Sequence, residues 1–185
     1  MKSIAARLSL FAGCFLLAGA MQIRAQERED EKAKPAAEIV ALDECDPTTF
    51  NAVLGTAFCH NVTLGAFTKL EDLFKKAAAG TPDPGWDFEP DAVSIKKGAV
   101  LTIVDQGGEP HTFTEVKAFG GGFIPGLNAP GEDVVPECSN GFANIKVART
   151  RILQGSQLQI NGLSEGEHRF QCCIHPWMRV TVDVK

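Results

Sequence analysis

Alternating apolar and polar positions in the second half of the chain predict a series of short β-strands. The clearest case is Arg179–Val184 (RVTVDV), where every second residue is valine. Similar short runs, alternating or rich in β-branched residues, occur at Ala99–Val104, Thr112–Val116, Ser156–Ile160 and Glu167–Cys172. Glycine and proline separate these runs, as they do in turns between strands. The β pattern starts near Trp86 and predicts a sandwich or a barrel.

Residues 39–80 have a different pattern, which predicts a small helical segment ahead of the β-rich part. Asp46 followed by Pro47 suits the N-cap and the first position of a short helix. Gly55 fits the end of that helix, because glycine is favoured just beyond a last helical turn.

A second helix is predicted later in the same segment. Thr68 and Glu71 have the spacing of a capping box, and Gly80 fits the stop. The apolar residues between them recur at helical intervals: Leu70, Leu73, Phe74 and Ala77. The turn-rich stretch 81–85 then forms the boundary to a β domain at 86–185.

Residues 1–25 have the layout of a secretory signal peptide. Lys2 and Arg7 precede an uncharged run from Leu8 to Ala20, and Ala25 offers a small residue at the cleavage site. A membrane anchor or a buried helix is the alternative, but these 13 residues are too few to span a bilayer. Residues 26–38 are charged and indicate a flexible tether. We therefore expect a periplasmic or secreted protein, in a compartment where disulfides persist.

Net charge narrows the classes of partner. The chain carries a formal charge of −5, and loss of the signal peptide with its three basic residues lowers this to −8. No basic surplus is present to neutralise phosphates, so we expect no nucleic-acid partner. No segment after the signal peptide is long and apolar enough to predict a membrane span.

The loop before the last predicted strand carries the most informative chemistry. Cys172, His175 and Met178 follow one another at Cys-x-x-His-x-x-Met spacing, and His111 opens a predicted strand upstream. Two histidines, one cysteine and a weakly bound methionine are the ligand set of a blue-copper electron-transfer site. Zinc is the alternative ion, but methionine suits it poorly and structural zinc sites usually contain more cysteines.

Methionine usage favours the same interpretation. The chain has three methionines, and Met1 and Met21 belong to the expected signal peptide. Met178 is therefore the one methionine of the mature chain, and it falls at the position of the axial ligand. A methionine that only fills a core could lie anywhere.

These residues resemble the small copper proteins called cupredoxins, and most closely the amicyanin and plastocyanin branch. The ligand loop matches the amicyanin loop position for position at Cys172, His175, Pro176 and Met178. The strand Gly166-x-His168-x-Phe170-x-Cys172 is similar to the family's Gly-x-Tyr-x-Tyr-x-Cys strand, and the segment 107–111 resembles the one before the family's first histidine ligand.

The resemblance covers residues 86–185 and implies a mainly β fold, a cupredoxin-like Greek-key sandwich, after the helical segment. It also implies one copper ion, bound by His111, Cys172, His175 and Met178. Two positions depart from the family's pattern. Thr112 stands where the family often has an asparagine that makes a hydrogen bond near the metal, and Cys173 lies directly beside the expected ligand.

The count of cysteines leaves several pairings open. Without the signal peptide five remain, and an odd number requires a use for one thiol. If Cys172 binds copper, Cys45 and Cys59 are the natural local pair, which leaves Cys138 for Cys173. Neighbouring residues on a strand point to opposite sides, so Cys173 would then face away from the metal. The alternatives are a free Cys173, or Cys173 as the ligand in place of Cys172.

The implied function is that of an electron carrier, cycling between Cu(II) and Cu(I), and not of an enzyme, because four protein ligands leave no open position. In the family the second histidine ligand reaches solvent, which makes His175 the electron port. An acidic chain favours redox partner proteins with a basic docking surface. The glycine-rich loop 119–126 is expected to cover the copper end or to contact a partner.

Two alternative functions remain. A copper-binding protein for delivery, storage or resistance usually has methionine- or histidine-rich tracts, and none is present here. An enzyme with an open copper site would follow if Met178 were not a ligand. The sequence gives no role for the helical segment.

Overall fold

The computed structural model of the chain describes residues 37–60 and 67–185. The predicted signal peptide and all but the last two residues of the predicted tether lie outside the described residues. Within the described ranges, no helix has both the length and the apolar character needed to cross a bilayer.

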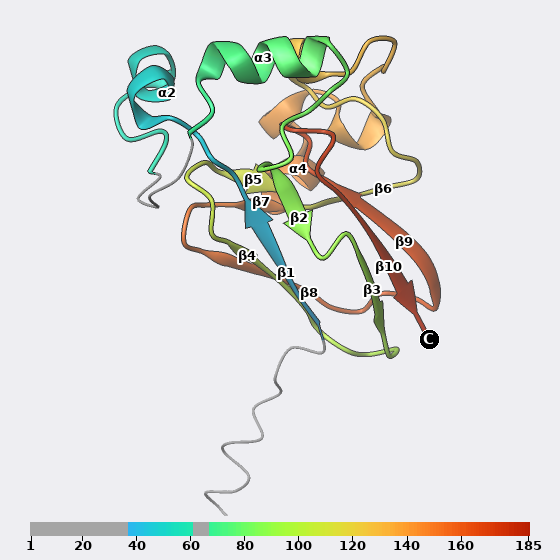
Figure 1. Cartoon of the computed structure of the whole chain (residues 1–185). Helices are drawn as coiled ribbons and strands as arrows, with labels where there is room; N and C mark the ends of the chain where they lie inside the picture. The colour runs from blue at the N-terminus through green and yellow to red at the C-terminus, as the bar shows by residue number, and fades with distance from the viewer. Residues whose placement is uncertain (1–36, 61–66) are drawn as a thin grey trace, which may run out of the picture. The chain divides into compact units, whose positions relative to one another are not determined.

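One sheet has four strands in the order β2-β1-β4-β8 (Figure 1). The strands are β1 (Ala37–Leu42), β2 (Asp87–Glu89), β4 (Leu101–Asp105) and β8 (Gln157–Ile160). Strand β1 runs parallel to β4, with Ile39 opposite Ile103, and antiparallel to β2. Nearly all of β4 is buried, as expected of a strand between two others.

The other sheet has the order β3-β10-β9-β6. Its strands are β3 (Ala92–Ile95), β6 (Thr114–Val116), β9 (Gly166–Gln171) and β10 (Arg179–Val184). The alternation read from the sequence at β10 is real, because Val180, Val182 and Val184 are buried while the residues between them are partly exposed. A short separate ladder joins β5 (His111–Thr112) to β7 (Arg151–Ile152).

The main core lies between these sheets. One cluster of buried side chains includes Ile39, Ile103 and Phe88 from the first sheet and Phe170 and Val182 from the second. Residues from the first and last strands therefore share one core, and the predicted mainly β sandwich is confirmed.

The boundary of the predicted helical segment differs at its N-terminal end. Residues 39–42 belong to β1 and not to a helical region, so the sandwich begins well before residue 86. Strand β1 has six residues, which are too few for the spacing of its apolar positions to distinguish a strand from a helix. Their pairing with β4, about sixty positions later in the chain, decides the conformation.

The two predicted helices are present. Helix α2 (Pro47–Leu54) has Asp46 as its N-cap, with the carboxylate accepting from the N–H groups of Thr48 and Thr49, and Gly55 as its C-cap. Helix α3 (Leu70–Ala78) ends shortly before Gly80. Both lie together at one end of the strands (Figure 1). Phe50 of α2 and Leu73 of α3 share a buried cluster with Trp86.

The predicted capping box at α3 is wrong. The N-cap is Lys69, which makes no side-chain capping hydrogen bond. The hydroxyl of Thr68 instead donates to Asp83 over 2.6 Å. Asp83 also accepts from Lys76 Nζ at 2.6 Å and from the N–H of Gly85 at 3.1 Å. This buried carboxylate therefore ties both ends of α3 to the turn that leads to Trp86.

The segment between β6 and β7 contains short helical turns and no further strand among the described residues. These are η1 (Pro125–Leu127), η2 (Pro136–Cys138), η3 (Gly141–Ala143) and α4 (Ile145–Arg149). Two disulfides are formed, Cys45–Cys59 and Cys138–Cys173, and Cys172 is a free, buried thiol. Of the pairings left open by the sequence, the structure therefore has the one that keeps Cys172 available.

We expect Asp83→Asn to lower the free energy of unfolding by about 1–3 kcal/mol at pH 7, because it removes a buried acceptor of charged and neutral donors. Burial alone would raise the pKa of Asp83. The hydrogen bonds from Lys76, Thr68 and Gly85 lower this pKa by more than burial raises it, so the net shift is downward. This stabilisation is complete above the usual carboxyl pKa and is lost as the pH falls through the lowered value.

Chemical denaturation at pH 7 and in acid measures the effect. The matched control is Asp91→Asn, the same change at an exposed position. If the two variants unfold at the same denaturant concentration, Asp83 does not anchor α3.

Candidate metal centre

Three predicted ligands converge in the interior. His111 lies on β5, Cys172 follows β9, and His175 lies in the loop that leads to β10. Cys172 Sγ is 3.9 Å from Nδ1 of each histidine, and the two Nδ1 atoms are 3.4 Å apart. All three side chains are buried, with at most 1% of the residue exposed. The sequence separates His111 from the other two by about sixty residues, and the fold brings them together.

This triangle suits a first-row metal ion. Bonds of about 2.0–2.3 Å to nitrogen and sulfur hold neighbouring ligand atoms about 3–4 Å apart, which is the spacing found here. One thiolate and two imidazoles form a donor set that binds copper strongly. The residues therefore fit a copper ion.

Met178 is fully buried in the same apolar cluster as Cys172. Its backbone closes the ligand loop, because its N–H donates to the carbonyl of His175 and its carbonyl accepts from the N–H of Cys172, both at 3.0 Å. These two hydrogen bonds close the loop that carries Cys172, His175 and Met178. Ligation by its thioether stays a prediction.

Backbone N–H groups surround the sulfur of Cys172. The N–H of Thr112 is 3.4 Å from Sγ and that of His175 is 3.5 Å from it. The hydroxyl of Thr112 accepts from the N–H of Cys173 at 2.7 Å, which joins β5 to the segment that follows β9. Thr112 stands where the family often has an asparagine. It makes hydrogen bonds both to the sulfur of Cys172 and to the N–H of Cys173.

The glycine-rich loop packs directly behind the ligand loop. The N–H of Phe123 donates to the carbonyl of Cys173 at 2.9 Å. A Cβ on Gly122 would lie 2.1 Å from the same carbonyl oxygen, so no larger residue fits there without moving the backbone. The expectation that residues 119–126 cover this end of the fold agrees with these contacts.

Each histidine has a buried carboxylate on the side away from the triangle. His111 Nε2 is 3.1 Å from Asp43 Oδ2, and His175 Nε2 is 3.4 Å from Glu109 Oε2. Asp43 also accepts from the N–H groups of Glu109 and Cys45. Carboxylates in this position orient a ligating imidazole and increase its basicity.

The sequence analysis missed both carboxylates. Asp43 lies 68 positions before His111, in the stretch assigned to the helical segment, and no local pattern connects the two. Glu109 offered a weak signal in the sequence. It is a charged residue between Gly108 and Pro110, two positions before the candidate ligand His111.

The electrostatics favour a thiolate. Burial alone would raise the pKa of Cys172. Hydrogen bonds and charge from His111 and His175 have the larger, opposite effect, and the pKa of this thiol lies well below its ordinary value. Burial likewise raises the pKa of Asp43, and the bond to His111 with two N–H donors brings it below the usual range. Thiolate is the form that binds metals. The same interactions raise the pKa of His111 and of His175, although burial opposes this, so a metal ion that binds at their Nδ1 atoms displaces protons.

The expected exposed edge of His175 is not found. The residue is 1% exposed, and its ring lies 4.7 Å from that of Trp86 and 5.5 Å from that of Trp177. Trp86 belongs to the cluster that includes α2 and α3. The helical segment, for which the sequence indicated no role, therefore helps to cover this histidine. The inference of an exposed edge came from family resemblance, which did not include residues 39–80.

No family model matches the chain, and no curated protein sequence matches it. Several solved structures do. A purple cupredoxin from Nitrosopumilus maritimus is 16% identical, with a TM-score of 0.42, and the match covers 80% of this chain and 99% of that one. Plastocyanin from Dryopteris crassirhizoma is 13% identical, with a TM-score of 0.37, and the match covers 80% of this chain and 99% of that one. Amicyanin from Paracoccus versutus is 21% identical over 54% of this chain and 73% of its own, with a TM-score of 0.35.

These solved structures are cupredoxins. The two four-stranded sheets of this chain agree with the sandwich that the sequence predicts. At these identities and TM-scores the chemistry of the site rests on its own residues.

We expect a soluble, neutral gadolinium chelate to leave the ring protons of His175 nearly unbroadened in NMR spectra of the full chain, because the ring has no solvent-facing edge. His60 is the internal control, since it is exposed and its signals should broaden strongly. Equal broadening of the two histidines would show that Trp86 and the helices do not cover His175.

Proposed function

We propose that the chain is an exported type 1 copper protein that carries single electrons, with His111, Cys172, His175 and Met178 as ligands. The observation that carries this proposal is the buried triangle of Cys172 Sγ and the two histidine Nδ1 atoms, 3.4–3.9 Å apart. Copper, when bound, supplies a one-electron couple between Cu(II) and Cu(I). A thiolate and two imidazoles are ligands that serve both oxidation states.

The residues around the triangle keep its geometry fixed. Thr112 joins the strand of His111 to the segment of Cys172 and Cys173, the carboxylates hold both imidazole rings, and the ligand loop is closed on itself. A site that changes little when an electron arrives exchanges it rapidly. Burial also excludes water and substrates from the ligands, which supports a carrier and not an enzyme. Two disulfides in the described ranges fit an oxidising compartment, periplasmic or extracellular.

We expect the Cu(II)-loaded protein to show an intense visible band from the copper–thiolate bond, and Cys172→Ser to abolish it. The control is the double variant Cys138→Ala/Cys173→Ala, which removes two neighbouring sulfurs and leaves the ligand in place. A pale spectrum of the unmodified protein would mean that the thiolate is not a ligand. A band that survives in Cys172→Ser would contradict the assignment.

We expect Asp43→Asn to raise the reduction potential. The carboxylate beside His111 stabilises Cu(II) more than Cu(I), and asparagine keeps an acceptor at the same place without the charge. A tenfold fall in the affinity of the site for Cu(II) relative to Cu(I) raises the reduction potential by about 59 mV for one electron. We expect the potential to rise by at least this amount. Redox titration measures it, with Asp91→Asn as the control of equal charge. Equal potentials for the two variants would show that Asp43 does not tune the site.

A further inference from the structure

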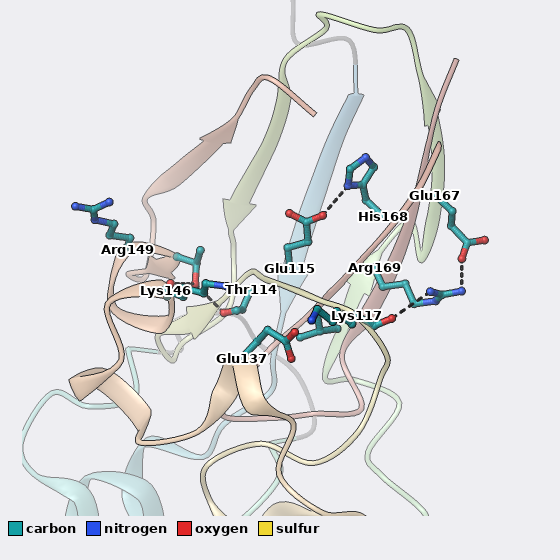
Figure 2. A pocket seen from close by; sticks show the side chains of 11 residues that line it. Thr114, Glu115, Lys117, Glu137, Lys146, Arg149, Glu167, His168 and Arg169 are labelled. Atoms are coloured by element: carbon teal, nitrogen blue, oxygen red, sulfur yellow. Dashed lines mark hydrogen bonds and ion pairs between the residues drawn. The ribbon is translucent and has the colours of Figure 1, made fainter. Parts of the chain in front are cut away.

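A second feature of the molecule lies outside the ligand triangle. A cleft of about 570 Å³ is lined by residues of β6, β9 and α4 (Figure 2). Lys146 and Arg149 come from α4, while Lys117 follows β6 and Arg169 belongs to β9. Basic residues therefore line the cleft on both of its walls.

Two of the acidic residues in this cleft are already neutralised. Glu115 pairs with His168 at 2.6 Å, and Glu167 pairs with Arg169, as the dashed lines in Figure 2 show. The bond to Glu115 raises the pKa of His168, although burial opposes this, so the ring carries positive charge more readily.

The remaining charge in the cleft is mainly positive. Lys117, Lys146 and Arg149 are exposed and have no ion-pair partner within residues 37–60 and 67–185, and Glu137 is the one acidic lining residue without a pair there. A concentration of unpaired positive charge is unexpected on a chain whose formal charge is −5. Such a local field attracts and orients anionic partners.

The cleft is also joined to the metal centre by a short covalent path. Cys172 is followed in the chain by Cys173, whose sulfur is bonded to that of Cys138. This disulfide is fully buried and packs with Val116, which lines the cleft. Glu137, the neighbour of Cys138, is another lining residue. The histidine edge, in contrast, is closed by Trp86 and Trp177.

We propose that this cleft is the docking surface for an acidic redox protein, whose carboxylates meet Lys117, Lys146 and Arg149. The proposal rests on the proposed electron-carrier function. One electron passes from the reduced site, which becomes Cu(II), to an oxidised metal centre of the partner, which is reduced by one unit, and no proton or group is transferred. Charge over the whole chain predicts a basic partner, but the local charge next to the ligand strand favours an acidic one.

The first test uses hexacyanoferrate(III), a small trivalent anion that accepts one electron, in place of the partner. Stopped-flow oxidation of the Cu(I) protein is compared for the unmodified chain and for Lys146→Glu/Arg149→Glu. The matched control is Lys69→Glu/Lys96→Glu, which changes the net charge equally at exposed positions outside the cleft. We expect the cleft variant to react at least tenfold more slowly at low salt, and the control to slow by less than threefold.

High salt provides an internal check. At about 1 M ionic strength the Debye length is near 3 Å, so the difference between the variants should largely vanish. If both double variants slow equally at low salt, electrons do not leave through the cleft and the proposal is overturned.

A second measurement separates this proposal from the copper function. Hexacyanocobaltate(III) has the same charge but does not exchange electrons readily, and its binding to the full chain can be followed by amide chemical shifts with or without copper. Shifts centred on 116–117 and 146–150 support the cleft even if the visible spectrum rules out a copper–thiolate bond. Shifts elsewhere, or none, would falsify the anion site even in a protein that is blue and cycles.

Discussion

The hydrogen bond between His111 and Asp43 connects the proposed metal centre to three other parts of the chain. Asp43 directly follows β1, accepts from the N–H of Cys45 at the start of the disulfide-bonded helical segment, and accepts from the N–H of Glu109 in the loop before His111. A carboxylate without these donors would be costly to bury. Even the adjoining loop is shaped by it, because a Cβ on Gly107 would lie 1.9 Å from Asp43 Oδ2. One side chain therefore links the end of β1, the helical segment and the proposed ligand His111.

The parts of the site that could be predicted from the sequence are those encoded locally. Cys172, His175 and Met178 lie within seven residues, so their spacing alone indicates a metal loop. The valine alternation of β10 is similarly local. The pairing of Cys138 with Cys173 was one of the alternatives that the count of cysteines left open, and the structure has it.

The parts that could not be predicted depend on contacts between distant segments. Strand β1 is too short to show a period, and its conformation comes from pairing with β4. The carboxylate of Asp43 meets His111 only after the chain has folded. Thr68 has a capping residue's spacing, yet its hydroxyl finds a stronger, charged acceptor in Asp83. The covering of His175 by Trp86 likewise joins a helical segment to a β domain that the sequence treats as separate.

The adjacency of Cys172 and Cys173 has a consequence for how the protein matures. Thiolates attack disulfides, so in an oxidising compartment both sulfurs compete for Cys138 in the unfolded chain. Only the folded structure distinguishes them, because it turns one sulfur toward the imidazoles and the other toward Cys138. A bond between Cys138 and Cys172 would remove the thiolate from the proposed metal site. Formation of the sheet before oxidation favours the correct disulfide, and capture of Cys172 by a metal ion would protect it from the wrong partner.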